Sequence, residues 1–317
     1  VYSSRYQIKM GGLEKLHSFD INKYEKIYLE LVKQKLVRPE EVFVPEEVSQ
    51  EDILRVHTPQ FLTSLHDSKT VARYLEAPIV ALLPSQSLDG VILTPFRYAT
   101  GGTVLAARLA RQYGIAINLG GGYHHAKPDG GEGFCVYADM PIAIRVLQSE
   151  KAVDKVLVVD LDVHQGNGTA VCFRGSKKVF TFSMHEDDIY PIPKARSDLD
   201  VPLPAGTDDQ QFLAILGRYL PGLLEDFQPE LVFLQAGCDT LAEDPLAHLA
   251  MTQEGIVQRD ALVIDECVRR EIPVVMVLGG GYSKNAWAVQ YASIERTIRK
   301  YGLVPGTNVT QENEPNQ

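Results

Sequence analysis

The stretch Val158-Val-Asp-Leu-Asp-Val-His-Gln-Gly-Asn-Gly168 marks the end of a buried strand and the start of a polar site. An apolar run over residues 156–159 leads into Asp160, Asp162 and His164. Alternate side chains of an extended segment point the same way, so these three groups are expected to line one side of the chain. Two carboxylates and an imidazole suit Zn²⁺ better than Ca²⁺ or Mg²⁺, which prefer oxygen ligands alone. A strand that ends in a solvated loop is the alternative, and the histidine and the glycines after it favour a metal site.

On both sides of this stretch, short apolar runs alternate with amphipathic segments. The pattern predicts strands at residues 115–119, 156–159, 179–184, 231–235 and 273–278, and helices at 23–35, 50–57, 104–113, 138–149, 210–227, 252–270 and 285–300. A long loop is expected at 185–208. Such alternation predicts an α/β fold, with a mainly parallel sheet and helices on both faces. Ligands bind beyond the carboxyl ends of the strands in such sheets, and every polar cluster of this chain follows a predicted strand.

The composition is that of a globular protein, with 317 residues, 45% hydrophobic and 23% charged. With no linker or repeat in the sequence, we expect one domain at residues 1–307 and a polar, disordered tail at 308–317. The net charge of −10 argues against a nucleic-acid-binding surface. No apolar stretch approaches membrane-spanning length, so no membrane association is expected. Four widely spaced cysteines favour a reducing compartment, which predicts a cytoplasmic location, or a nuclear one in a eukaryote.

A second cluster, Gly120-Gly-Gly-Tyr-His-His-Ala126, places two adjacent histidines after a glycine-rich strand end. His124 or His125 could act as a general base or acid, and a surface histidine pair is the alternative. A third cluster contains Asp239, which follows the strand at 231–235. Together with Asp162 and His164 it would make three ligands and leave one coordination position open, as in catalytic rather than structural metal sites. Taken alone, Asp239 would be a helix cap or turn residue.

The fourth cluster is Gly279-Gly-Gly-Tyr282, which follows the last predicted strand. A tyrosine after a flexible glycine turn can direct its hydroxyl towards a substrate oxygen, although packing at a turn is the commoner use of Tyr. The four clusters together predict one composite site.

The motifs Gly-Gly-Tyr-His-His-Ala, Gly-Phe-Cys, Val-Asp-Leu-Asp-Val-His-Gln-Gly-Asn-Gly, Gly-Cys-Asp-Thr-Leu and Gly-Gly-Gly-Tyr resemble the zinc-dependent histone deacetylase family, in that family's order, over residues 120–282. The segment Gly12-Leu-Glu-Lys-Leu-His-Ser-Phe-Asp20 and Asn167 resemble its class IV branch in particular. The resemblance implies an arginase-like three-layer αβα fold. It also implies hydrolysis of the amide of N-ε-acyl-lysine, acetylated or longer, in proteins or peptides.

The resemblance further implies a role for individual residues. One Zn²⁺ would be bound by Asp162, His164 and Asp239, with His124 and His125 beside the attacking water and Tyr282 on the acyl carbonyl. The supporting groups would be Asp160 for His124 and Asn167 for His125. The substrate tunnel would be lined by Gly133, Phe134, Tyr190 and Gly280. A structural K⁺ or Na⁺ would lie among Asp160, Ser183 and backbone carbonyls that include those of Asp162, His164 and Met184.

The chemistry of these groups favours His125 as the general base and His124 as the group that orients the water, with Asp160 fixing the tautomer of His124. Two positions depart from the family pattern. Asn167 stands where many relatives have Asp, and a neutral amide stabilises imidazolium less than a carboxylate, so we expect a lower pKa for His125 than in those relatives. The region 93–97 lacks the acidic residue that many relatives carry on a loop at the tunnel rim, so a firm grip on a peptide backbone is not expected.

Several alternatives remain open from the sequence. The substrate could be a small acylated amine such as an acetylpolyamine, or a lysine that carries a long acyl chain. A ureohydrolase would need two metals, and only one complete ligand set is visible. A non-catalytic acyl-lysine binder would be expected to lack His125 or Tyr282, and both are present. We interpret the histidines at 17, 57, 66, 185 and 248 as structural or surface residues, with His17 near the tunnel rim. The oligomeric state is not indicated.

Overall fold

The computed structural model describes residues 1–302, apart from the side chains of Lys15 and Leu16. The tail predicted at 308–317 and the predicted domain end at 307 lie outside these residues. At the centre is one six-stranded sheet in the order β1-β6-β5-β2-β3-β4, and every neighbouring pair is parallel. The strands are β1 (Ile115–Asn118), β2 (Val156–Asp160), β3 (Val179–Glu186), β4 (Leu199–Leu203), β5 (Leu231–Gln235) and β6 (Val274–Val277).

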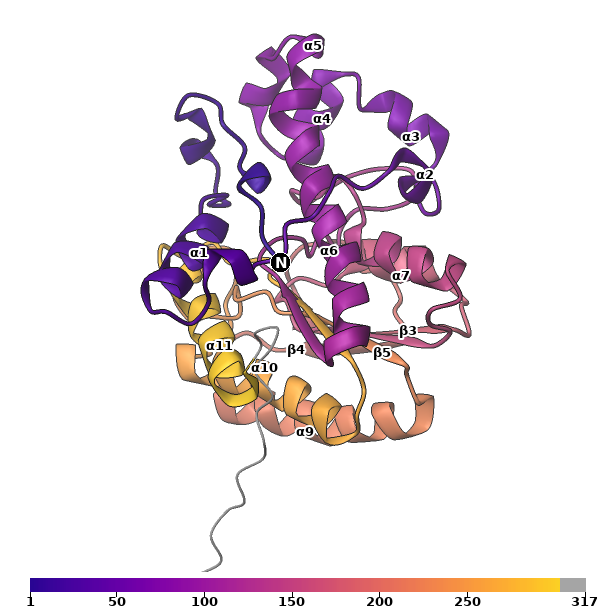
Figure 1. Ribbon diagram of the computed structural model, residues 1–317, viewed down its shortest axis with the longest axis vertical. Helices are drawn as coiled ribbons and strands as arrows, with labels where there is room; N and C mark the ends of the chain where they lie inside the picture. Colours follow the sequence, from indigo (N-terminus) through magenta and orange to yellow (C-terminus); the bar gives the residue numbers. More distant parts are fainter. Residues whose placement is uncertain (303–317) are drawn as a thin grey trace, which may run out of the picture.

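Helices cover both faces of the sheet, which confirms the predicted three-layer arrangement (Figure 1). α6 (Thr94–Tyr113) packs on β1 and β6 and against α7 (Asp139–Ser149) on one side. α9 (Asp209–Phe227), α10 (Gln253–Arg269) and α11 (Ala286–Tyr301) lie on the other, with α1 (Lys23–Lys33) against α11. Strands β1, β2, β5 and β6 are buried along their whole length, as expected for apolar runs covered on both faces.

The short helices α2 (Gln50–Ile53), α3 (Pro59–Ser64), α4 (Ser68–Tyr74) and α5 (Ser85–Leu88) gather beyond one end of α6 (Figure 1). A further short helix, α8 (Asn167–Phe173), follows β2 directly. 3₁₀ turns lie at Ser4–Tyr6, Leu13–Leu16, Pro39–Glu41 and Pro78–Leu82. Among residues 1–302, no helix combines the length and hydropathy needed to cross a bilayer.

Three predictions about these elements were wrong. The helix predicted at 50–57 is the four-residue α2, which ends at Ile53. The expected loop at 185–208 contains β4, an edge strand that is only partly buried and carries Pro202, which sheets tolerate at an edge. The helix predicted at 104–113 begins earlier, at Thr94, directly after a π-helical turn at Asp89–Leu93. The region 93–97 is therefore helical rather than a loop. The nearby carboxylate of Asp89 is paired with Arg97, 2.7 Å away.

The strand order places a topological switch point between β2 and β5. The chain passes from β2 to β3 and β4 on one side, and then returns to β5 on the other side of β2. Crevices at such points, outside the carboxyl ends of the strands, are the usual binding sites of open α/β sheets. The polar stretch after β2 therefore lies beside the one after β5.

Candidate active site

Asp162, His164 and Asp239 converge at the switch point. All three are buried, and their candidate ligand atoms lie within 4.8 Å of one another. The Nδ1 atom of His164 lies 3.3 Å from Asp162 Oδ1 and 3.1 Å from Asp239 Oδ2. Burying two carboxylates side by side is costly unless a cation compensates them. The donor set of two carboxylates and one imidazole matches a zinc site with an open position.

Without a metal, protons compensate these charges. Burial and the neighbouring Asp162 charge raise the pKa of Asp239 to about 7. Burial disfavours the imidazolium of His164, but its hydrogen bonds to Asp162 and Asp239 outweigh burial and raise its pKa to about 10. A divalent cation would displace these protons, because metal ligands bind in their deprotonated forms.

Glycine backbone approaches the triad closely. The N–H of Gly280 donates a hydrogen bond to Asp162 Oδ2 at 2.9 Å. A Cβ atom on Gly280 would overlap the Asp239 carboxylate, and one on Gly237 would overlap the Asp162 carboxylate. Gly280, predicted as a tunnel residue, therefore lies directly against the candidate metal ligands.

His124 and His125 lie side by side, with ring centroids 4.1 Å apart, and both are buried. The Nδ1 atom of His124 is 2.8 Å from Asp160 Oδ2, and the Nδ1 atom of His125 is 2.8 Å from Asn167 Oδ1. The Nε2 atom of His124 lies 3.8 Å from Asp162 Oδ1. Anchoring one ring nitrogen fixes the orientation of an imidazole and leaves the other nitrogen for chemistry.

The two imidazoles differ in their affinity for a proton. Burial disfavours a charge on His124, but the Asp160 and Asp162 carboxylates outweigh burial and raise its pKa to about 9. Burial and the charges of His124 and His164 hold the pKa of His125 well below its usual value, and the bond to Asn167 offsets this only in part. His125 is thus the neutral member of the pair, as a general base must be.

Aromatic rings flank the approach to this centre. Gly133 and Phe134 both have left-handed backbone, with φ of 53° and 66°, and a Cβ on Gly133 would lie 2.5 Å from the His125 ring. The Tyr190 ring centroid is 5.0 Å from that of His125, and the Phe134 centroid is 5.8 Å from that of Tyr282. The Tyr282 ring is 6.1 Å from that of His164. The predicted tunnel residues and Tyr282 therefore surround the histidine pair and the triad.

The residues predicted to bind a monovalent cation are also adjacent. Asp160 and Ser183 are register partners in β2 and β3, and Met184 follows Ser183. The Ser183 hydroxyl is 2.9 Å from Nδ1 of His185. The cation itself stays a prediction.

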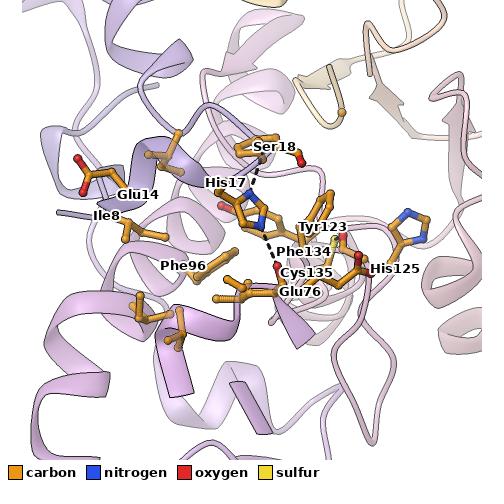
Figure 2. Close-up of a pocket in the computed structure, with 18 of the residues that line it drawn as sticks. Ile8, Glu14, His17, Ser18, Glu76, Phe96, Tyr123, His125, Phe134 and Cys135 are labelled. Carbon is orange, nitrogen blue, oxygen red and sulfur yellow. Dashed lines mark hydrogen bonds between the residues drawn. The ribbon is translucent and has the colours of Figure 1, made fainter. Parts of the chain in front are cut away.

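A largely apolar pocket of about 300 Å³ adjoins the site (Figure 2). Its lining includes His124, His125, Phe134 and Tyr282. It extends to apolar side chains of the N-terminal loop, of the segment after α4, and of the π-helical turn and first turn of α6: Ile8, Met10, Leu13, Ile79, Val80, Ile92 and Phe96. Sequence reasoning missed this pocket because apolar residues from three separate segments form no local motif.

His17 forms part of the wall of this pocket rather than the outer surface. Its Nδ1 atom accepts a hydrogen bond from the Phe19 N–H at 3.0 Å, so its Nε2–H donates to the carbonyl of Leu75 at 2.8 Å. Its ring packs edge-on against Phe134, with centroids 4.7 Å apart. Figure 2 shows His17, Phe134 and His125 in the same pocket.

Two buried cations brace the site and were also missed. The Lys23 ammonium donates to the Gly279 carbonyl at 2.7 Å, and burial lowers its pKa. The Arg259 guanidinium donates to the carbonyls of Leu161 and Gly237 at 3.0 and 2.9 Å. Both residues lie in amphipathic helices. The sequence pattern of such a helix predicts that its charged residues are exposed, so the burial of these two could not be predicted.

The chain is similar to known proteins over most of its length. The family model for the histone deacetylase domain matches residues 17–298. Histone deacetylase 2 of Arabidopsis thaliana is 39% identical over 307 residues, which are 96% of this chain and 79% of that protein. The solved HD domain of HDA15 has a TM-score of 0.74 at 21% identity, covering 95% of this chain and 92% of that one. Acetylpolyamine aminohydrolase from Burkholderia pseudomallei has a TM-score of 0.69 at 20% identity, covering 90% and 96%.

Proposed function

The chain belongs to the histone deacetylase family, and from this premise we propose that it is a zinc-dependent hydrolase that removes acyl groups from the ε-amino group of lysine in proteins or peptides. The observation that carries the proposal is the buried Asp162–His164–Asp239 triad beside two imidazoles whose Nδ1 atoms are both anchored. Among the described residues, this is the group of acidic and histidine side chains that could hold a metal ion.

Asp162, His164 and Asp239 would hold one Zn²⁺. When bound, the ion would lower the pKa of water to about 7 and polarise the acyl carbonyl. His125, neutral at physiological pH, would take a proton at Nε2 and return it to the leaving amine. His124, charged through Asp160, would stabilise the negative charge that develops at the carbonyl oxygen.

Tyr282 would donate a hydrogen bond to that same oxygen. Its pKa lies well above the usual value because of burial and the charges of Asp239 and Asp162, so the phenol keeps its proton. Phe134 and Tyr190 would hold the aliphatic stem of the lysine between their rings, and Gly133 lets the chain approach His125 closely.

A second substrate class has an observation in its favour. The pocket of about 300 Å³ beside His125 and Tyr282 is mainly apolar, which supports acyl chains longer than acetyl. A small acylated amine is a further candidate, in line with the name of the structural neighbour acetylpolyamine aminohydrolase. Membership of class IV, a structural K⁺ or Na⁺ ion and a cytoplasmic location stay predictions.

The decisive experiment is an acyl-chain panel on lysine peptides and polyamines with the zinc-loaded protein. We expect hydrolysis of acyl-lysine peptides that is lost on chelation and in His125→Ala. Metal analysis that finds two ions per chain would favour a ureohydrolase. Binding of acyl-lysine peptides without turnover would instead favour a non-catalytic binder.

A further inference from the structure

The amide of Asn167 is held from both ends. Its Oδ1 atom lies 2.8 Å from Nδ1 of His125, and its Nδ2 atom donates a hydrogen bond to Oε1 of Glu132. Asn167 is buried at the first residue of α8, whereas Glu132 belongs to the loop before Gly133 and Phe134. Two segments 35 residues apart therefore meet at this amide.

The direction of the amide decides the tautomer of His125. An Asn side chain has one end that accepts and one that donates hydrogen bonds, and a neutral imidazole has one nitrogen of each kind. With Oδ1 facing His125, Nδ1 must carry the proton and Nε2 keeps the lone pair. If the NH₂ group of Asn167 faced Nδ1 of His125 instead, the imidazole proton would lie on Nε2. Nε2 could then no longer accept a proton from water. A carboxylate only accepts, so Glu132 holds the NH₂ group away from His125.

Glu132 is itself fixed by its surroundings. Its Oε2 atom accepts a hydrogen bond from the Lys127 ammonium at 2.8 Å, and the two side chains are 33% and 31% exposed. The Tyr190 hydroxyl also hydrogen-bonds the Glu132 carboxylate, and burial and the Glu132 charge raise the pKa of Tyr190. The backbone carbonyl of Glu132 accepts from the N–H of Cys135 at 2.9 Å.

We propose that Glu132 is a positioning residue for hydrolysis, which holds the Asn167 amide so that His125 presents an unprotonated Nε2. The inference rests on the proposed function, because it gives His125 the role of proton acceptor. Many relatives are expected to carry a carboxylate where this chain has Asn167. In this chain the carboxylate of Glu132 lies on the far side of the Asn167 amide and acts on His125 through that amide. Lys127 and Tyr190 keep that carboxylate in place.

The first test is the activity of Glu132→Gln in the zinc-loaded full chain, on an acetyl-lysine peptide. A glutamine can offer the Asn167 amide either a donor or an acceptor, so the orientation is no longer fixed. We expect kcat to fall by about 10- to 100-fold with little change in KM, the usual range for groups that orient functional side chains. The control is Glu150→Gln, an exposed carboxylate that pairs with Arg108 far from the site. A kcat for Glu132→Gln within twofold of the control would overturn the proposal.

The second test is rescue by Asn167→Asp. In the wild-type background this change sets two carboxylates against each other, so we expect lower activity. In the Glu132→Gln background, the introduced carboxylate can accept directly from His125 and from the glutamine amide, so we expect the double variant to be about tenfold more active than Glu132→Gln alone. A purely structural role for Glu132 predicts no rescue, and a double variant that is no better than Glu132→Gln would contradict the proposal.

The third test needs no turnover. In metal-free protein with ¹⁵N-labelled histidine, the His125 signal is assigned by its loss in His125→Gln. We expect the Nδ1–H tautomer in the wild type and a mixture of tautomers in Glu132→Gln. An unchanged tautomer would refute the positioning role, even where activity falls. If the wild-type protein had no hydrolytic activity but the tautomer of His125 still changed in Glu132→Gln, the positioning role of Glu132 would be supported. The proposed function would then be refuted on its own.

Discussion

Zinc affinity is expected to rise steeply with pH, because the metal must displace the protons held by Asp239 and His164. Their pKa values of about 7 and about 10 mean that both groups are largely protonated at a pH near 6. At that pH, binding one Zn²⁺ should release about two protons. Between pH 6 and 8, deprotonation of these two groups should tighten zinc binding by at least ~10³-fold.

Competition with a fluorescent chelator measures the affinity, and calorimetry in buffers of different ionisation enthalpy counts the protons.

Both raised pKa values stabilise the metal-free fold at low pH, and that contribution is lost as pH rises through about 7 for Asp239 and about 10 for His164. The difference in Tm between loaded and metal-free protein should therefore widen with pH. His248→Gln, outside the triad and paired with Glu186, is the matched control. Release of fewer than about one proton near pH 6, or an affinity that changes less than about tenfold, would refute this reasoning.

Three further outcomes are expected. Tyr282→Phe should lower kcat by about 10²–10³-fold, the usual loss for one oxyanion donor, with unchanged zinc affinity by chelator competition. Gly280→Ala should weaken zinc binding because its Cβ would overlap the Asp239 carboxylate, whereas Gly217→Ala, in open space within α9, should raise the free energy of unfolding by about 0.5–1 kcal/mol in urea melts. Met10→Trp should fill the apolar pocket and lower turnover of decanoyl-lysine relative to acetyl-lysine, and an unchanged ratio would argue against acyl binding there.

The elements of the fold that follow a local sequence pattern could be predicted from the sequence. The buried strands and the helices that cover them follow from apolar runs and amphipathic periods, and the parallel sheet follows from their alternation. β4 was missed because Asp200 and Pro202 interrupt a five-residue strand that is only partly buried. The start of α6 was missed because its first turns are continuous with a π-helical turn, which has no sequence signature.

Some residues of the site could likewise be predicted from local sequence, and others could not. Asp162 and His164 are recognisable in the sequence as candidate ligands because they follow a buried apolar strand, and Asp239 because it follows another. The structure differs from the expected extended segment, since β2 ends at Asp160 and residues 162–164 lie in a bend. Glu132 could not be identified from its surroundings in the sequence, because its proposed role depends on a contact with Asn167, 35 residues away. Lys23 likewise reaches a carbonyl 256 residues further along the chain. Contacts at such separations are products of tertiary structure.

The strand order also decides when a metal ion can bind during synthesis. Asp239 reaches His164 across a separation of 75 residues, and only after the chain has travelled out to the β4 edge and back. A nascent chain that has emerged only as far as β4 contains two of the three candidate ligands, Asp162 and His164, and lacks the strand that precedes Asp239. The candidate metal site is therefore completed only after β5 has docked beside β2, and a ribosome-bound fragment that ends before Asp239 is expected not to bind zinc at this site.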